Sequence, residues 1–418
     1  MKYAKKMRED SRLIIDYAID RVMPGRAVEE VLEKQGFSGG RVFLVGVGKA
    51  AWKMTEAAIN VLNRRKIPFE KGIVLTKYGH IYGELEKTVC LEAGHPVPDE
   101  NSFKGTEEIL KMTRNLNKDD TVLFLLSGGG SALFEDPATE PDEMAGITDQ
   151  LLAAGADIVE VNSVRKRLSN VKGGRFAEHC APAKVVSVIL SDIIGNPVDM
   201  IASGPACVDS STCADALKVV EEYGISLSEK AREYLKTETP KSLSNVESHI
   251  CGSVNELCES AMKKAEELGY EPVLLTETLD GEAKEAGRFF GAIGRFRNNP
   301  DKNTAYIAGG ETVVYVTGDG KGGRNQEMAL AVAKDIAGIS NVLFFSVGSD
   351  GTDGPTDAAG GIADGYTLER MAEAGIDAER ELENNNSYEA LKVADGLVIT
   401  GPTGTNVNDL SVLLIQKK

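Results

Sequence analysis

Apolar runs of strand length alternate with amphipathic stretches of helical length along most of this chain, and this alternation limits the folds open to it. In the first half, the strand-like runs are Arg41–Val45, Gly72–Thr76, Thr88–Leu91, Val122–Leu126 and Lys184–Leu190. Helical patterns, such as Lys49–Asn63 and Ser102–Leu116, separate these runs. Strands that are apolar almost throughout and alternate with helices predict an α/β fold with a mostly parallel sheet, covered by helices on both faces.

Two domains are expected, because 418 residues are too many for one ordinary hydrophobic core. A polar stretch rich in Ser and Thr, Lys236–Val246, is the candidate boundary. It divides the chain into domains of residues 1–236 and 246–418. The first of these begins with a helical pattern over residues 1–35. In the second, Ala305–Ala308 and Thr312–Val316 are predicted to form a pair of strands.

The net charge of -17, from 47 Lys and Arg against 64 Asp and Glu, argues against nucleic acid or an anionic membrane as the main partner. No apolar stretch reaches membrane-spanning length, and the charged N-terminus lacks a secretory signal pattern. The six cysteines have neither C-x-x-C nor zinc spacing, so free thiols in a reducing cytoplasm are expected. The sequence therefore predicts a cytoplasmic protein. If this acidic protein binds an anion, it must do so in a local basic pocket.

Three consecutive glycines end the apolar run Val122–Leu126. The sequence there is Ser127, Gly128, Gly129, Gly130 and Ser131. Ligands of parallel sheets bind at the carboxyl ends of strands, and successive glycine N–H groups can cradle an anion there. No lysine follows at P-loop spacing. The loop is therefore predicted to bind an anion or a nucleotide phosphate, and a tight turn without a ligand is the alternative.

A second glycine loop, Gly46–Ala51, fits the G-x-G-x-x-A dinucleotide pattern after a predicted strand. The full fingerprint needs an acidic residue after the next strand, whereas this chain has Lys77 there. This disfavours NAD and leaves a phosphorylated cofactor open. Lys49 lies in the expected first helical turn, where a cation opposes the helix dipole. A nearby phosphate or carboxylate would explain Lys49, and a solvated surface lysine is the alternative.

A basic cluster and two further polar loops complete the candidate site residues. The cluster comprises Arg165, Lys166, Arg167, Lys172 and Arg175, and a second anion site or a solvated helix face would each account for it. Arg324 stands at the start of a predicted helix. Asp350, Asp353 and Asp357 follow an apolar strand, and their spacing does not match an EF-hand calcium loop. Carboxylates on a loop after a strand do suit Mg²⁺, and turns capped by aspartate are the alternative.

The four histidines are scattered without ligand spacing, and Ser131 lacks a G-x-S-x-G pattern. Zinc chemistry and serine hydrolysis are therefore disfavoured. Glycine loops, a few cations and loop aspartates are typical of phosphoryl transfer, in which positioning and charge neutralisation do most of the chemistry.

Six motifs together resemble the glycerate 2-kinases with a MOFRL domain. They are Ser127–Ser131, Val164–Lys166 with Lys172–Arg175, Gly309–Thr312, Gly322–Glu327, Asp350–Ala359 and Thr400–Asp409. The resemblance implies phosphorylation of D-glycerate to 2-phosphoglycerate with ATP and Mg²⁺. It also implies a Rossmann-like N-terminal domain and a C-terminal domain with a MOFRL region at about residues 303–412, with the site in the cleft between them. A hydroxypyruvate reductase using NAD(P)H is the alternative, and a homodimer is left open.

The resemblance also suggests roles for individual residues. Lys49 and Arg324 are expected to meet glycerate or the transferred phosphoryl group, and Asp350 to act as a base or Mg²⁺ ligand. Ser127–Ser131 and Lys172 are expected to bind nucleotide phosphate, and Asp192 and Asp353 to hold the metal. The chain departs from the family pattern at two positions. Arg167 stands where many relatives have a histidine, and Asn196 stands where relatives often have an acidic residue. The second departure leaves Asp192 as the only carboxylate in that segment that is a candidate metal ligand.

Overall fold

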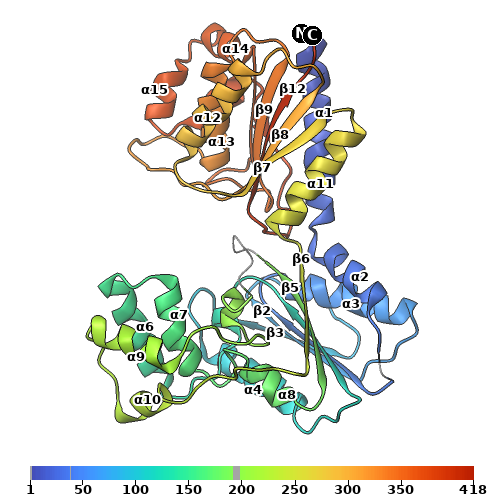
Figure 1. Cartoon of the computed structure of the whole chain (residues 1–418), viewed down its shortest axis with the longest axis vertical. Helices are drawn as coiled ribbons and strands as arrows, with labels where there is room; N and C mark the ends of the chain where they lie inside the picture. The colour runs from blue at the N-terminus through green and yellow to red at the C-terminus, as the bar shows by residue number, and fades with distance from the viewer. Residues whose placement is uncertain (1, 38, 192–197) are drawn as a thin grey trace. The chain divides into compact units, whose positions relative to one another are not determined.

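A computed structural model describes residues 2–37, 39–191 and 198–418, and its contacts divide the chain into two compact units (Figure 1). The parallel-sheet unit contains Pro24–Ser191 and residues 198–251. The mixed-sheet unit contains the first 23 residues together with Gly252–Lys418. This division differs from the expected ranges of residues 1–236 and 246–418 at both ends of the first domain.

The parallel-sheet unit contains six strands in the order β3-β2-β1-β4-β5-β6, all of them parallel. They are β1 (Val42–Val47), β2 (Lys71–Lys77), β3 (Thr88–Ala93), β4 (Thr121–Leu126), β5 (Lys184–Leu190) and β6 (Val246–Cys251). Every residue of β1 and β4 is buried, because helices cover both faces at the centre of the sheet. The prediction of a parallel α/β sheet is confirmed, and the strand order is that of a Rossmann fold.

The helices of this unit form two groups. Against the sheet lie α2 (Pro24–Lys34), α3 (Ala51–Arg64), α4 (Glu100–Met112), α5 (Gly130–Leu133) and α8 (Arg175–Cys180). A separate helical cluster, drawn in green in Figure 1, comprises α6 (Pro141–Ala154), α7 (Ile158–Arg167), α9 (Cys213–Glu222) and α10 (Glu229–Tyr234). Leu151, Val164 and Val219 belong to the small apolar core of this cluster.

The mixed-sheet unit contains six strands in the order β11-β10-β9-β12-β8-β7, of which only β7 and β8 are parallel to each other. They are β7 (Glu271–Leu279), β8 (Thr304–Gly310), β9 (Val342–Gly348), β10 (Gly360–Asp364), β11 (Leu397–Val398) and β12 (Asp409–Ile415). The predicted strand over Thr312–Val316 is wrong, since only Val313 makes a single bridge there. Tyr315 and Val316 are exposed, so apolar side chains alone suggested a strand that has no partner along its length.

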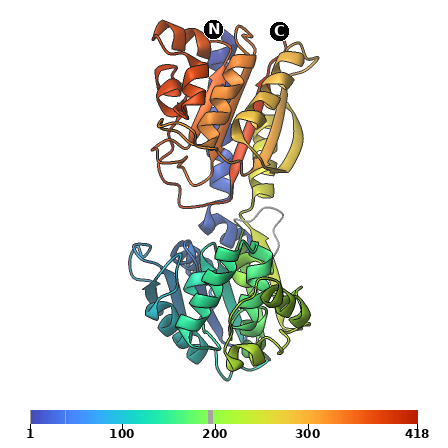
Figure 2. The same ribbon diagram turned by 90° about the vertical axis from the view of Figure 1, so that its left-hand side faces the viewer.

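Helices cover both faces of the mixed sheet. One face carries α1 (Lys2–Arg21) and α11 (Val254–Glu267), and the other carries α12 (Ala283–Phe296) and α13 (Arg324–Asp335). The short helices α14 (Thr367–Glu373), α15 (Ala378–Glu383) and α16 (Ser387–Val393) pack around α13. Figure 2 shows the orange and red helices in front of the strands, with the blue α1 behind them. None of the helices in the described ranges is both long and apolar enough to cross a membrane.

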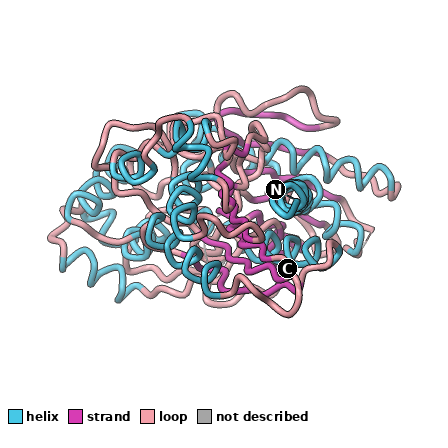
Figure 3. The backbone as a smooth tube through the Cα atoms, turned by 90° about the horizontal axis from the view of Figure 1, so that it is seen from above, coloured by secondary structure: helices cyan, strands magenta, loops and turns pink. Residues whose placement is uncertain are grey.

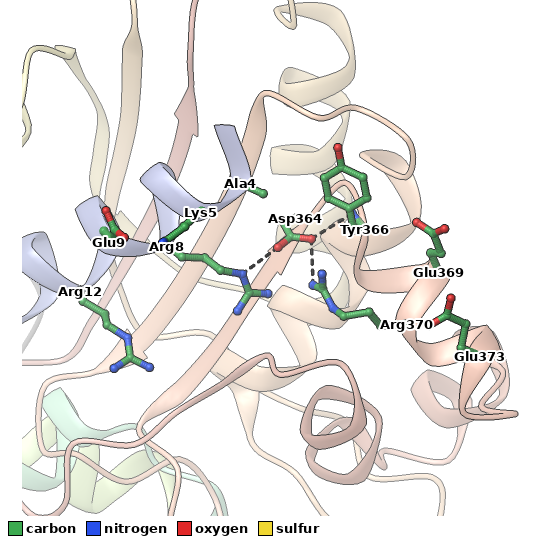
Figure 4. A pocket seen from close by; sticks show the side chains of 10 residues that line it. All are labelled: Ala4, Lys5, Arg8, Glu9, Arg12, Asp364, Tyr366, Glu369, Arg370 and Glu373. Carbon is green, nitrogen blue, oxygen red and sulfur yellow. Dashed lines mark hydrogen bonds and ion pairs between the residues drawn. The ribbon is translucent and has the colours of Figure 1, made fainter. Parts of the chain in front are cut away.

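The first helix joins a unit whose other residues come from the far end of the chain. Arg8 Nε donates to Asp364 at 2.8 Å, and Arg370 from α14 binds the same carboxylate (Figure 4). Tyr270 donates to Asp10 at 2.9 Å. Figure 3, viewed from above, shows both chain ends toward the viewer. The predicted helix over residues 1–35 is therefore two helices, α1 and α2, that belong to different units.

Candidate active-site residues

The triple-glycine loop and the Lys49 loop meet at the carboxyl ends of the neighbouring strands β4 and β1. The N–H of Lys49 donates to the carbonyl of Gly128 at 2.9 Å, and the N–H of Ala50 donates to the Ser127 hydroxyl at 3.0 Å. The Ser127 side chain is buried, so its hydroxyl fixes the start of α3. The sequence prediction that these two loops lie at the ligand-binding edge of the sheet agrees with this geometry.

Gly129 is the residue at which this loop approaches the side chains of His95 and Lys49. Its φ of +88° is strained for any residue with a side chain. A Cβ there would lie 3.0 Å from His95 Cδ2 and 3.3 Å from Lys49 Cγ. Gly130 opens the one-turn helix α5, and a Cβ on it would lie 2.6 Å from Ala202 Cβ. A side chain at either position would therefore push against the groups that these glycines approach.

Two histidines and two lysines gather around the loop. Burial, followed by the charges of Lys49 and Lys77, lowers the pKa of His95 below the usual histidine value. His80 lies beside them, with Nδ1 3.0 Å from the Lys49 carbonyl oxygen. The four histidines are scattered in sequence without ligand spacing, so their pattern did not predict that His80 and His95 would lie at this loop. The available signal was their position, since His80 follows β2 and His95 follows β3 at the same edge as the glycine loop.

Ser131 is tied to a strained segment behind the loop. Its hydroxyl lies 3.3 Å from that of Ser203, and Ser203 donates to Asn162 at 3.0 Å. Ala202 and Ser203 are buried with φ values of +51° and +60°, which costs about 1–3 kcal/mol for each residue. Strained, buried backbone of this kind gathers at functional sites, because the surrounding structure must hold it in place.

The predicted basic cluster is mostly an internal ion-pair network. The side chains of Lys166 and Arg167 are buried and both bind Asp209. Lys172 is fully buried, and its ammonium donates to Glu135 at 2.6 Å and to a carbonyl at 3.0 Å. Burial lowers the pKa of Lys172 to about 8. The predicted phosphate role of Lys172 does not fit this arrangement, because its ammonium faces Glu135 rather than an open loop.

Arg324 begins α13 in the mixed-sheet unit, as predicted, but its guanidinium has protein partners. Nε and Nη2 bind the two oxygens of Asp409 at 2.6 and 3.0 Å, and Nη1 lies 2.8 Å from Glu311. Burial raises the pKa of Asp409 to about 6, although the guanidinium opposes this. The guanidinium of Arg324, which we expected to meet glycerate or the transferred phosphoryl group, already binds a protein carboxylate that lies 85 residues away in sequence.

The loop aspartates differ in their fit to a metal ion. Both oxygens of Asp353 accept N–H groups at the start of α13, from Asn325 at 3.1 Å and Gln326 at 2.9 Å. Asp353 is thus a buried helix cap and does not fit a metal ligand. Asp350 is half-buried, and one of its oxygens accepts the Thr352 N–H at 2.9 Å. It fits Mg²⁺, which needs only one or two carboxylates.

A complete metal site does not emerge from the described residues. They contain no group of three or more His, Cys, Asp or Glu side chains placed to hold a metal. Asp192 and Asn196 lie outside the described residues. The Mg²⁺ ligands therefore stay a prediction, with Asp350 as the described carboxylate that suits the role.

Comparisons with known proteins agree with these features. A domain of unknown function, DUF4147, matches residues 10–236, and the MOFRL family matches residues 304–409. The D-glycerate 2-kinase of Thermotoga maritima is 53% identical over 96% of this chain and 97% of its own. A relative from Agrobacterium vitis that carries a hydroxypyruvate reductase name is 40% identical over 98% of this chain and 94% of its own.

A solved structure extends the match to the fold. The crystal structure of glycerate kinase from Thermotoga maritima has a TM-score of 0.93 and 51% identity, and it covers 98% of this chain and 100% of its own. The match covers nearly the whole of both chains. The chain therefore belongs to the glycerate 2-kinase family, in which a DUF4147 domain precedes a MOFRL domain.

Proposed function

We propose that this protein phosphorylates D-glycerate at the 2-hydroxyl, with ATP as donor and Mg²⁺ as the metal. The observation that carries the proposal is the cationic glycine loop at the carboxyl ends of β1 and β4, within a chain of net charge -17. Lys49, Lys77 and His95 surround this loop, in which Gly129 adopts a φ that favours glycine. Such a site suits a phosphate far better than an uncharged, apolar ligand.

Lys49 is the proposed cation for the transferred phosphoryl group. It is exposed, and its backbone is fixed by the bond to Gly128. Phosphoryl transfer spreads negative charge over the equatorial oxygens, and a positioned ammonium stabilises that charge. Mg²⁺ would neutralise the β- and γ-phosphates, with Asp350 as a ligand or as the group that accepts the glycerate proton.

We propose that Arg324 binds substrate through only part of its guanidinium group, because Asp409 already occupies two of its nitrogens. Its bond to Glu311 is single and that carboxylate is half exposed, whereas Asp409 is buried and bound through both oxygens. An incoming anion would therefore displace Glu311 from Nη1 and leave the Asp409 pair intact. In this arrangement Asp409 orients the guanidinium, and the substrate meets its outer edge.

A coupled assay tests the proposal against reduction of hydroxypyruvate. We expect ADP release from D-glycerate, ATP and Mg²⁺, with 2-phosphoglycerate identified by ³¹P NMR, and loss of activity after EDTA that Mg²⁺ restores. Hydroxypyruvate with NADH should give no oxidation of the cofactor, because Lys77 stands where an NAD site has an acid. The same assay with NADPH tests the phosphorylated cofactor, which Lys77 does not exclude. Formation of 3-phosphoglycerate alone would contradict the regiochemistry, and turnover of hydroxypyruvate alone would contradict the kinase.

A further inference from the structure

A pocket of about 790 Å³ lies in the parallel-sheet unit beside the triple-glycine loop. Its lining comes from the segment after β3, which includes Pro96 and Phe103, and from the segment after β4, which includes Met144 and Arg165. Its volume falls within the range of small-molecule sites, about 300–1,000 Å³. The activity proposed above involves two small molecules, and glycerate is far too small to fill this space.

Two contacts join the pocket to the glycine loop. Arg165 lines the pocket and donates through Nη2 to the Ser131 carbonyl at 3.4 Å. Pro96 also lines the pocket, and the preceding residue, His95, approaches Gly129. A ligand that fills the pocket could therefore reach the loop with one end.

The walls of the pocket suit a flat, largely apolar ring. Val97, Phe103, Met144 and Leu152 line it, together with several prolines. Val97 is 68% exposed and Leu152 is 57% exposed, so a bound ring would remove apolar surface from water at both positions.

Two lining side chains retain unused hydrogen-bonding capacity. Glu135 is 1% exposed, and its Oε1 has no hydrogen-bond partner among the described residues. Nε of Arg165 is likewise buried without a partner in the described ranges. Buried groups of this kind are usually satisfied, and leaving one unpaired costs about 1–3 kcal/mol. A nucleoside offers both donors and acceptors, and it would satisfy these two atoms once a small shift of the Glu135 and Arg165 side chains exposes them to the pocket.

The charges around the pocket fix the orientation of such a ligand. Six carboxylates line it, from Asp99, Glu100, Glu135, Glu140, Asp142 and Asp149, and Arg165 is the one cation among the lining residues. A triphosphate would be repelled from this rim. The lysines and histidines gather instead around the glycine loop. A nucleotide would thus place its uncharged base and ribose in the pocket and its phosphates at the loop.

We infer that this pocket holds the nucleoside of the phosphoryl donor, with the phosphates extending along Ser127–Ser131 toward Lys49 and His95. The inference rests on the proposed kinase activity for the identity of the ligand. It adds the segments after β3 and β4 to the site as the walls that bind the base.

Two alanines on the same helix give a matched test. Ala145 and Ala153 are both exposed on α6, but only Ala145 lines the pocket. In the full-length enzyme, we expect Ala145→Trp to raise the KM for ATP at least tenfold, with the KM for D-glycerate and the kcat at saturating ATP within twofold of wild type. Ala153→Trp should leave all three values unchanged.

Calorimetry with ADP and Mg²⁺ separates this inference from the proposed function. Wild type and Ala153→Trp should bind ADP, and Ala145→Trp should bind it at least tenfold more weakly. If glycerate is not phosphorylated but this binding pattern is found, the nucleoside pocket stands and the kinase proposal fails. Equal ADP affinity in the two tryptophan variants, or no ADP binding by wild type, would overturn the pocket assignment whatever the activity.

Discussion

Gly129 shows how much one residue without a side chain contributes to the candidate site. Gly129 and Gly155 have nearly the same φ, +88° and +87°, but only Gly129 has other groups within 4 Å of a Cβ position. We expect both Gly→Ala variants to lose about 1 kcal/mol of unfolding free energy from backbone strain. Only Gly129→Ala should also raise the KM for ATP, because its methyl group would push against His95 and Lys49.

Urea unfolding and steady-state kinetics check this pair of variants. Gly155→Ala serves as the control, since it carries the strain without the contact. An unchanged KM for ATP in Gly129→Ala would show that the loop does not meet the nucleotide.

His95 should report the arrival of an anion through its pKa. In the free protein, burial and the charges of Lys49 and Lys77 hold the pKa of His95 below 6.5. A phosphate at the glycine loop adds negative charge, so ADP should raise this pKa. An NMR titration of the histidine Cε1–H resonances, assigned with His95→Gln, measures the change. An identical titration curve at saturating ADP would contradict a phosphate near His95.

The same residue sets a direction for the dependence of stability on pH. Because the folded-state pKa is lower than the unfolded value of about 6.5, the unfolded chain takes up the proton first as the pH falls. His95 therefore contributes stability that is present above pH 6.5 and is lost below it. The loss of unfolding free energy on acidification should be smaller in His95→Gln than in wild type.

At the scale of elements, an ion pair between Arg8 and Asp364, which are far apart in sequence, holds α1 to the mixed sheet. Asp364 at the end of β10 is 1% exposed and binds both Arg8 and Arg370. Arg8→Ala should lower the unfolding free energy by about 1–3 kcal/mol, because a buried carboxylate loses one of its two charged partners. Arg12→Ala, at an exposed position of the same helix, should stay within about 0.5 kcal/mol of wild type. Equal effects of the two substitutions would show that the pair contributes little.

At the scale of the whole molecule, the two units predict which fragments fold. A fragment of residues 24–251 retains all six parallel strands, whereas a fragment of residues 1–236 lacks β6 and carries α1 away from its sheet. We expect the first fragment to be monodisperse and to unfold cooperatively by circular dichroism, and the second to aggregate or to unfold at a lower temperature. Equal behaviour of the two fragments would favour the boundary at Lys236–Val246.

The sequence alone determined the features that depend on local pattern. The runs that became β1, β2, β4 and β5 are apolar almost throughout, which only a sheet covered on both faces can accommodate. The glycines of residues 128–130 directly follow such a run, so their position at the ligand-binding edge followed from their place in the chain. The strand over Thr312–Val316 failed because apolar content does not supply a neighbouring strand.

Only the tertiary structure decided which charged groups meet. Arg324 is bound by Asp409, Lys172 by Glu135 and Asp364 by Arg8, and each pair is separated by at least 37 residues in sequence. The approach of His95 to Gly129 also depends on how the segment after β3 crosses the sheet edge. A residue type fixes how many hydrogen bonds and which charge a side chain offers. Its partner is fixed by the order of the strands and by the crossing of the connections, which no local pattern encodes.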